Sequence, residues 1–160
     1  MNMQLLEEDI DNIGHIVARR YFTEQGWNYT DLKLSGKNIL ESINVVNEQY
    51  DKYPYLSRDW YVENLAEKSI HLATRWDDLN ILGNLLLIVP DQFDFLLKFN
   101  SKKSMCIVVQ TELDDRQQHA IAEARKSGFN VYIFKTDVPK NMDFELEEVV
   151  GGISGRVNFK

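Results

Sequence analysis

Residues 85–111 have the sequence LLLIVPDQFDFLLKFNSKKSMCIVVQT, and its short apolar runs set the expected architecture. Three such runs span residues 85–89, 93–99 and 105–109. Apolar runs of this length, bounded by turn-forming residues, are typical of buried strands. Residues 100–104 are polar and form the expected hairpin connection between the second and third runs. A β-sheet is therefore predicted in this part of the chain.

The segment that follows has the pattern of a crossover between parallel strands. Residues 114–127 are rich in helix-forming residues, and Asp114 stands near the start, where negative charge suits the helix dipole. Gly128 ends this helix, and residues 131–134 form a further apolar strand. A strand, a helix and a strand in this order permit a right-handed parallel crossover, so the sheet is expected to be mixed.

Helices are predicted before these strands. Apolar residues spaced by three and four predict a helix over residues 5–25, which ends at Gly26. An extended segment is expected over residues 27–34 because aromatic and apolar residues recur there. The helical spacing returns over residues 37–49 and 58–76 and predicts two more helices.

These patterns predict an α/β fold in which helices flank a central mixed sheet. We expect one domain over residues 1–160, with a helical insert at about residues 37–80. In the C-terminal tail, residues 144–150 are expected to form a short helix and residues 153–159 an edge strand. The strands of the sheet are expected near residues 28–33, 85–90, 93–99, 105–110 and 131–135.

Composition narrows the class of protein. The 160 residues are 44% apolar, which suits a single domain with one sizeable core. No apolar run reaches the length of a membrane span and the N-terminus is acidic, so neither a span nor an export signal is predicted, and a cytoplasmic location is expected. The only cysteine, Cys106, lies in an apolar run and is expected in the core. The formal net charge of -7 does not favour broad attraction to nucleic acid, which requires Lys and Arg to neutralise phosphates.

Residues 89–95 (VPDQFDF) and 107–112 (IVVQTE) resemble the PD-(D/E)XK nuclease superfamily. In that family an Asp after Pro and an acidic residue on the next strand hold a divalent metal, and a Lys two residues further on helps to activate water. Side chains at i and i+2 of a strand share a face, so these groups converge on one point. The helix that begins near residues 116–118 and ends at Gly128, and the turn at residues 24–27, resemble archaeal resolvase-like domains. The resemblance implies a restriction-endonuclease-like fold.

The resemblance also implies a candidate catalytic site of Asp91, Gln110 and Glu112. Gln110 stands where the family has its second acid and Glu112 where it has its Lys, so the chain lacks the Glu-x-Lys or Asp-x-Lys pair. Asp91 and Glu112 would hold Mg²⁺, which lowers the pKa of an attacking water, while Gln110 orients the site. The glutamate that the family's opening helix often contributes falls near His15.

Arg19, Lys98 and Arg116 are the candidates for binding the phosphates of nucleic acid. His15 and His119 have no catalytic partner at a diagnostic spacing and are expected to be ordinary residues of polar helix faces.

Three functions remain open at this point. The first is a nuclease-like protein of nucleic-acid processing, a metal-dependent DNA endonuclease with an altered active site. The second is a catalytically inactive nuclease-fold protein that binds DNA or another protein, and the third is a small interaction module with no role on nucleic acid. In the last two, Asp91 shapes a turn, Gln110 caps a strand end and Glu112 belongs to a solvated helix start. The candidate partners are DNA, a protein and a second copy in a homodimer; no membrane is expected.

Overall fold

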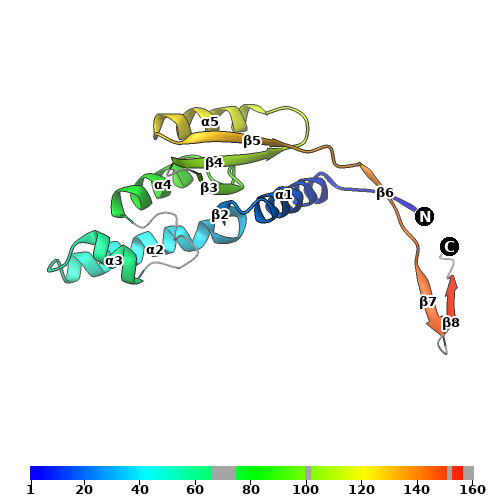
Figure 1. Cartoon of the computed structure of the whole chain (residues 1–160), viewed down its shortest axis with the longest axis horizontal. Coiled ribbons are helices and arrows are strands. Elements are labelled where there is room, and N and C mark those ends of the chain that lie inside the picture. The colour runs from blue at the N-terminus through cyan, green and yellow to red at the C-terminus, as the bar shows by residue number, and fades with distance from the viewer. Residues whose placement is uncertain (66–74, 100–101, 151–152, 157–160) are drawn as a thin grey trace.

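The computed structural model describes residues 1–65, 75–99, 102–150 and 153–156. In these residues the centre of the fold is a mixed sheet of four strands with helices on both faces (Figure 1). The order across the sheet is β2, β3, β4 and β5. The strands are Asn28–Asp31 for β2, Phe95–Phe99 for β3, Lys102–Val109 for β4 and Asn130–Lys135 for β5.

The pairing of these strands confirms the expected mixed α/β architecture. β3 is antiparallel to both β2 and β4, and β4 is parallel to β5. Phe95 pairs with Cys106 in the antiparallel register, and Ser104 pairs with Asn130 in the parallel one. Parallel neighbours need a crossover connection, which is helix α5, Asp115–Lys126. The predicted strand, helix and strand unit therefore forms.

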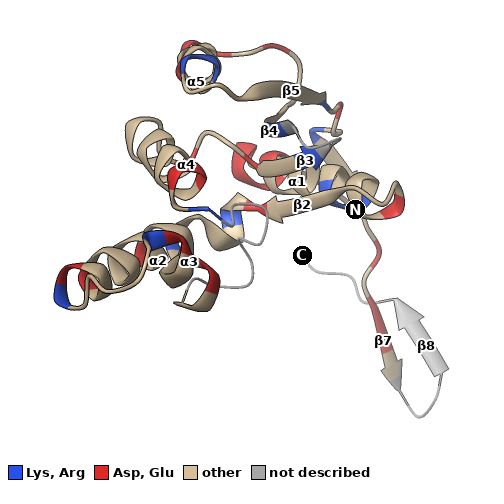
Figure 2. Ribbon diagram, turned by 60° about the vertical axis from the view of Figure 1, so that its left-hand side comes forward, with Lys and Arg blue, Asp and Glu red and all other residues tan. Residues whose placement is uncertain are grey.

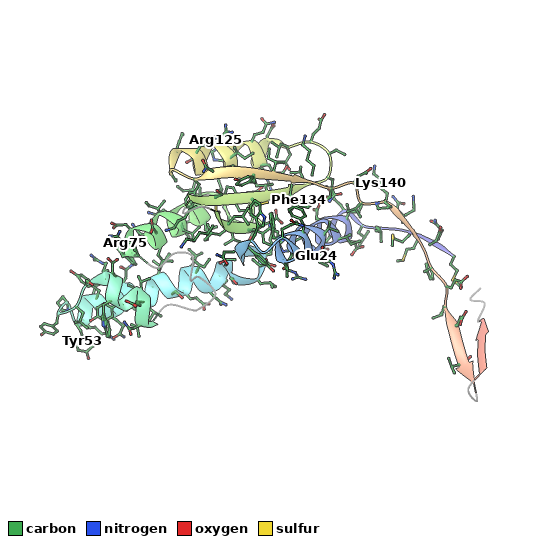
Figure 3. All side chains as sticks on the ribbon, in the orientation of Figure 1. Glu24, Tyr53, Arg75, Arg125, Phe134 and Lys140 are labelled. Atoms are coloured by element: carbon green, nitrogen blue, oxygen red, sulfur yellow. The ribbon has the colours of Figure 1, made fainter. Side chains whose placement is uncertain are left out.

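Helix α1, Glu7–Glu24, covers one face of the sheet. It ends at the predicted Gly26, whose φ of +71° lies in the left-handed region that glycine adopts without a steric cost. Phe134 of β5 lies between the sheet and α1, with its ring centroid 5.8 Å from that of Phe22 (Figure 3). The buried residues of this layer are Ala18, Phe22, Phe95, Leu97 and Cys106, which confirms the prediction that Cys106 belongs to the core.

The opposite face of the sheet carries the larger core, which α5 and the helices between β2 and β3 complete. Leu96, Met105 and Ile107 point to this side because side chains of a strand alternate between its faces. The helices between β2 and β3 are α2 (Leu32–Lys52), α3 (Arg58–Leu65) and α4 (Trp76–Ile88). They occupy the part of the chain where the sequence predicts a helical insert.

The strand predicted at residues 85–90 is wrong, because residues 85–88 form the end of α4 and residues 89–90 the turn that follows it. A short apolar run does not by itself distinguish a buried strand from a buried helix. Leu79, Leu82, Leu85 and Leu86 are buried at helical spacing, whereas Leu87 and Ile88 are exposed. Of the helix predicted over residues 58–76, the structure shows α3 up to Leu65, and Trp76 is the first residue of α4; residues 66–74 lie outside the described part of the chain.

The tail differs from the prediction as well. Within residues 144–150, where a helix was expected, the structure has strand β7, Glu147–Val150. Its β-branched residues Val149 and Val150 favour extended structure. β7 pairs with β8, Ile153–Arg156, in a separate two-stranded sheet, so β8 is not an edge of the central sheet. Residues 157–160 of the expected edge strand lie outside the described residues.

A third sheet, also of two strands, joins the N-terminal segment to the segment after β5. β1, Asn2–Gln4, pairs antiparallel with β6, Asn141–Asp143. No helix of the described residues is both long and apolar enough to cross a bilayer.

The two alternatives for residues 85–89 make opposite predictions for a pair of substitutions. In a strand, Leu85 and Leu87 would share a face, whereas in α4 Leu85 is 1% exposed and Leu87 is 66% exposed. We expect Leu85→Ala to lower the free energy of unfolding by roughly 2–5 kcal/mol through cavity formation, and Leu87→Ala to change it by less than about 0.5 kcal/mol. Urea unfolding followed by circular dichroism measures both; equal losses would contradict the helix.

Candidate functional site

A cavity of about 860 Å³ opens where the end of β2 and the end of β4 meet helix α1. One wall is α1, and the start of α2, the turn before β3 and the start of α5 complete the lining. The cavity is thus built from segments that are far apart in the sequence, and the sheet brings them together.

The base of this cavity holds a histidine between two aspartates. His15 Nδ1 lies 2.9 Å from Asp94 Oδ1, and His15 Nε2 lies 2.9 Å from Asp31 Oδ2. All three side chains are largely buried, with 12% of the His15 side chain exposed. The ring stacks on Phe95 at 4.5 Å between centroids and 11° between planes. This packing fixes the imidazole plane so that both nitrogens face a carboxylate.

Local structure holds both aspartates in place. Asp31 is the last residue of β2 and the N-cap of α2, where its Oδ1 accepts hydrogen bonds from the backbone N–H groups of Lys33 and Leu34. Asp94 precedes β3, and its backbone N–H donates to Cys106 O while its Oδ2 accepts from Val108 N at 2.7 Å. Each carboxylate is therefore bound to backbone through one oxygen and to His15 through the other.

The geometry favours a protonated His15 when both neighbouring aspartates are ionised. A neutral imidazole has one N–H donor and one lone pair, so it cannot donate to carboxylates on both sides. Burial opposes the charge, but hydrogen bonds and Coulomb attraction from Asp31 and Asp94 outweigh it and raise the pKa of His15 to about 9. Burial also tends to raise the pKa of Asp31, yet the hydrogen bond from His15 and its charge lower it overall. The site is thus an imidazolium between two carboxylates at neutral pH.

Acidic groups dominate the rest of the lining. Arg19 lies one turn after His15 on α1 and reaches Asp31 at 3.6 Å, and the Lys33 ammonium donates to the backbone carbonyl of Asp91 at 2.6 Å. The pKa of Asp11 is raised, first by burial and then by Glu7 and Asp94, while Lys33 lowers it. The acidic residues of the lining are Glu7, Glu8, Asp11, Asp31, Asp91, Asp94 and Asp114. The cationic ones are His15, Arg19 and Lys33, so the lining is negative overall.

The structure brings together two of the three predicted catalytic residues. Asp91 and Gln110 both line the cavity, whereas Glu112 is exposed and does not. Asp91 lies in the turn after α4 with a φ of 61°. The Gln110 amide donates to Ile10 O and accepts from Val138 N, so it joins α1 to the segment after β5. The catalytic role of these three residues, and the metal-binding role of Asp91 and Glu112, stay predictions.

The three predicted phosphate-binding residues lie apart. Arg19 lines the cavity. Lys98 on β3 and Arg116 on α5 are exposed and lie outside it.

Sequence reasoning missed the residues at the centre of the site. The prediction that His15 is an ordinary residue of a polar helix face is wrong, because its ring is buried and bonded on both sides. Two signals pointed to it: Asp94 interrupts an apolar run, and His15 falls where the resemblance expects an acid. His119, by contrast, is exposed on α5.

The two carboxylates beside His15 do not fit a divalent metal such as the resemblance implies. The oxygens of Asp31 and Asp94 are already engaged by backbone N–H groups and by the His15 cation, whereas Mg²⁺ requires several oxygen ligands of its own. In the described ranges, no cluster of three or more His, Cys, Asp or Glu side chains has the arrangement of a metal site.

Comparisons of the chain with protein families, with characterised proteins and with solved structures found no match.

The pKa shifts predict how stability depends on pH. His15 has a folded-state pKa of about 9, above its ordinary 6.5, so its contribution is complete below pH 6.5 and is lost as pH rises through 9. Asp31 has a lowered pKa, so its contribution is present above pH 3.8 and is lost as pH falls through the lower folded value. We expect the free energy of unfolding to be highest between pH 3.8 and pH 6.5, where both contributions are complete. As pH rises through 9, it should fall by on the order of 3 kcal/mol.

Urea unfolding at a series of pH values measures this profile. His15→Gln should abolish the alkaline decrease, and the same substitution at the exposed His119 should leave it unchanged. If the free energy of unfolding of His15→Gln still fell at alkaline pH, another group would be its cause.

Proposed function

We propose that this chain is a nuclease-like protein that keeps the fold for binding and not for metal-dependent cleavage, and that its cavity binds a basic segment of another protein. The observation that carries the proposal is the His15 imidazolium between Asp31 and Asp94.

The order of elements supports the nuclease-like fold. The resemblance implies an opening helix with a glycine turn, a strand hairpin, and then a helix, a glycine and a last strand. α1 with Gly26, the β3–β4 hairpin, and α5 with Gly128 and β5 follow this order. β5 lies parallel to β4, as a crossover through α5 requires.

The register of the hairpin supports the loss of catalysis. The carboxylate that reaches β4 is Asp94, through its bond to Val108 N, rather than Asp91 three residues earlier. If Asp94 takes the place of the family's first Asp, then Val108 takes the place of its second acid and Gln110 takes the place of its Lys. An isopropyl group cannot ligate a metal, and a neutral amide does not replace the ammonium that helps to activate water. The chain thus departs from the catalytic pattern at both positions.

The His15 cation supports the same conclusion. It lies between two carboxylates, in the place that a positive charge must take to offset their repulsion. A metal at this point would have to displace a buried ring that stacks on Phe95 and donates two charge-assisted hydrogen bonds. The protein therefore supplies this positive charge from its own side chain.

Charge favours a basic protein segment over DNA as the ligand. Seven carboxylates and three cationic groups line the cavity, so a phosphate backbone would be repelled. The raised pKa of Asp11, which burial and neighbouring carboxylates cause, indicates a negative potential that a bound Lys or Arg would relieve. The net charge of -7 adds long-range attraction for a basic partner.

Absence of catalysis is tested by incubating the protein with plasmid and branched DNA in Mg²⁺ or Mn²⁺. We expect no cleavage above that of an Asp94→Asn variant, because the donors at this site are already engaged. Metal-dependent cleavage by the wild type that disappears in both Asp94→Asn and Asp91→Ala would establish an endonuclease and remove this proposal.

Ligand class is tested by fluorescence anisotropy with a labelled Arg- and Lys-rich peptide and with labelled duplex DNA. We expect the peptide to bind, more weakly as salt rises, and the DNA not to bind. Removing three charges at the cavity with Glu7→Gln, Glu8→Gln and Asp11→Asn should weaken peptide binding roughly tenfold.

The matched control removes three exposed charges from α2, with Glu41→Gln, Glu48→Gln and Asp51→Asn. Equal weakening by both triple variants would mean that net charge alone attracts the peptide. Binding of DNA that weakens in Arg19→Ala would favour the nucleic-acid alternative.

A further inference from the structure

The outer edge of β5 is an unprotected strand edge. β5 is the last strand of the central sheet and pairs with β4 along one side, and no other strand of the described residues pairs with its outer side. Natural edge strands are commonly protected by Pro or charged side chains, but residues 131–134 are Val-Tyr-Ile-Phe. Ile133 is 42% exposed. The edge therefore offers backbone groups and apolar surface to another strand.

A groove lies beside this edge, between β5 and α5. Its volume is about 310 Å³, and Leu113 and Ile121 form one side while Val131 and Ile133 form the other. Arg125 is at its rim. An open strand edge next to an apolar groove is the arrangement that binds an extended segment by β-augmentation, in which backbone bonds give affinity and the groove receives alternate side chains.

The C-terminal tail has an exposed strand of its own, which complements the β5 edge and its groove. Residues 141–149 are exposed throughout, and Val149 is 67% exposed. β7 pairs with β8 in a sheet of two strands that extends away from the central sheet (Figure 1). An isolated two-stranded hairpin is at best marginally stable in water, so β7 has an edge that a further strand would stabilise.

The charges of the two surfaces match. Glu147 and Glu148 are acidic residues of β7, which carries acidic and no basic colouring in Figure 2. The edge and groove are flanked by two basic residues, Arg125 at the end of α5 (labelled in Figure 3) and Lys135 at the end of β5, whereas the neighbouring Lys126 is paired with Glu123 at 3.4 Å. Opposite charges on apolar surfaces favour one specific pairing.

The tail does not reach β5 of its own chain. Leu5 N donates to Lys140 O at 2.7 Å, and Phe144 N donates to Met1 O at 3.0 Å. Together with the β1–β6 pairing, these bonds tie residues 140–144 to the N-terminal segment, from which β7 leads away from the sheet (Figure 1). If β7 pairs with the β5 edge, it therefore has to be the β7 of another molecule.

We infer that two copies of this chain form a symmetric dimer in which β7 of each copy pairs with the outer edge of β5 of the other. Val149 packs toward the groove, and Glu147, which shares its face of β7, lies beside a basic residue that flanks the groove. The two contacts are reciprocal, as a twofold axis requires. This interface shares no lining residue with the acidic cavity, so the inference does not rest on the proposed function.

Sedimentation of the full chain over a range of concentrations tests the dimer. Val149→Asp in the tail and Ile133→Asp at the groove should each raise the dimer dissociation constant at least about tenfold, because each buries an unpaired charge. Leu87→Asp, at an exposed position of α4, should leave it unchanged. Mixing the two interface variants should restore association in part, since one chain keeps an intact groove and the other an intact tail.

Crosslinking gives a readout that does not depend on weakened association. Cys106 is buried and burial raises the pKa of its thiol to about 12, so an introduced cysteine is the reactive one. A chain with Ile133→Cys should form a disulfide with a chain that carries Val149→Cys, and not with a chain that carries Leu87→Cys. A wild-type chain that is monomeric at all concentrations, or a dimer that both Asp variants leave intact, would overturn the inference.

Discussion

The buried cation between two carboxylates is the interaction on which the arrangement of this protein depends. His15 lies on α1, Asp31 at the junction of β2 and α2, and Asp94 at the entry to β3, and the ring is within 2.9 Å of both carboxylates. The imidazolium offsets the repulsion of two acids that burial would otherwise make unfavourable. It thereby determines how close α1 lies to the sheet, and Gly14 meets this constraint because a Cβ there would lie 2.7 Å from Gln110 Nε2.

The same charge balance connects stability with the proposed function. A nuclease-like site gathers carboxylates at strand ends, and their repulsion has to be offset by a metal or by a protein cation. Here His15 and, more weakly, Arg19 supply that charge, while the outer acids of the cavity keep their negative potential. This division of charge is what the proposed binding of a basic segment requires.

The sequence predicted the parts of the fold in which a pattern has one structural solution. The helix that ends at Gly26, the β3–β4 hairpin and the α5–β5 unit formed as expected. The bounds of the hairpin differ, because β3 begins at Phe95 and β4 already at Lys102, within the residues expected to connect the two strands. Residues 85–89 did not, because an apolar run fits a buried helix as well as a buried strand. For the site, the sequence located Asp91 and Gln110 at the cavity but not His15, whose partners lie 16 and 79 residues away.

The linear pattern of apolar, acidic and turn residues was thus sufficient for the α/β class, the hairpin and the region of the candidate site, because these depend on periodicity and on near neighbours. Which side chains meet was settled by folding in three dimensions. The carboxylate that contacts β4 is that of Asp94, three residues after Asp91, and only the paired strands reveal this. Likewise, His15 keeps its charge above its ordinary pKa of 6.5 only because the sheet brings Asp31 and Asp94 to its two nitrogens, since protonation responds to distances in space and not to separation along the chain.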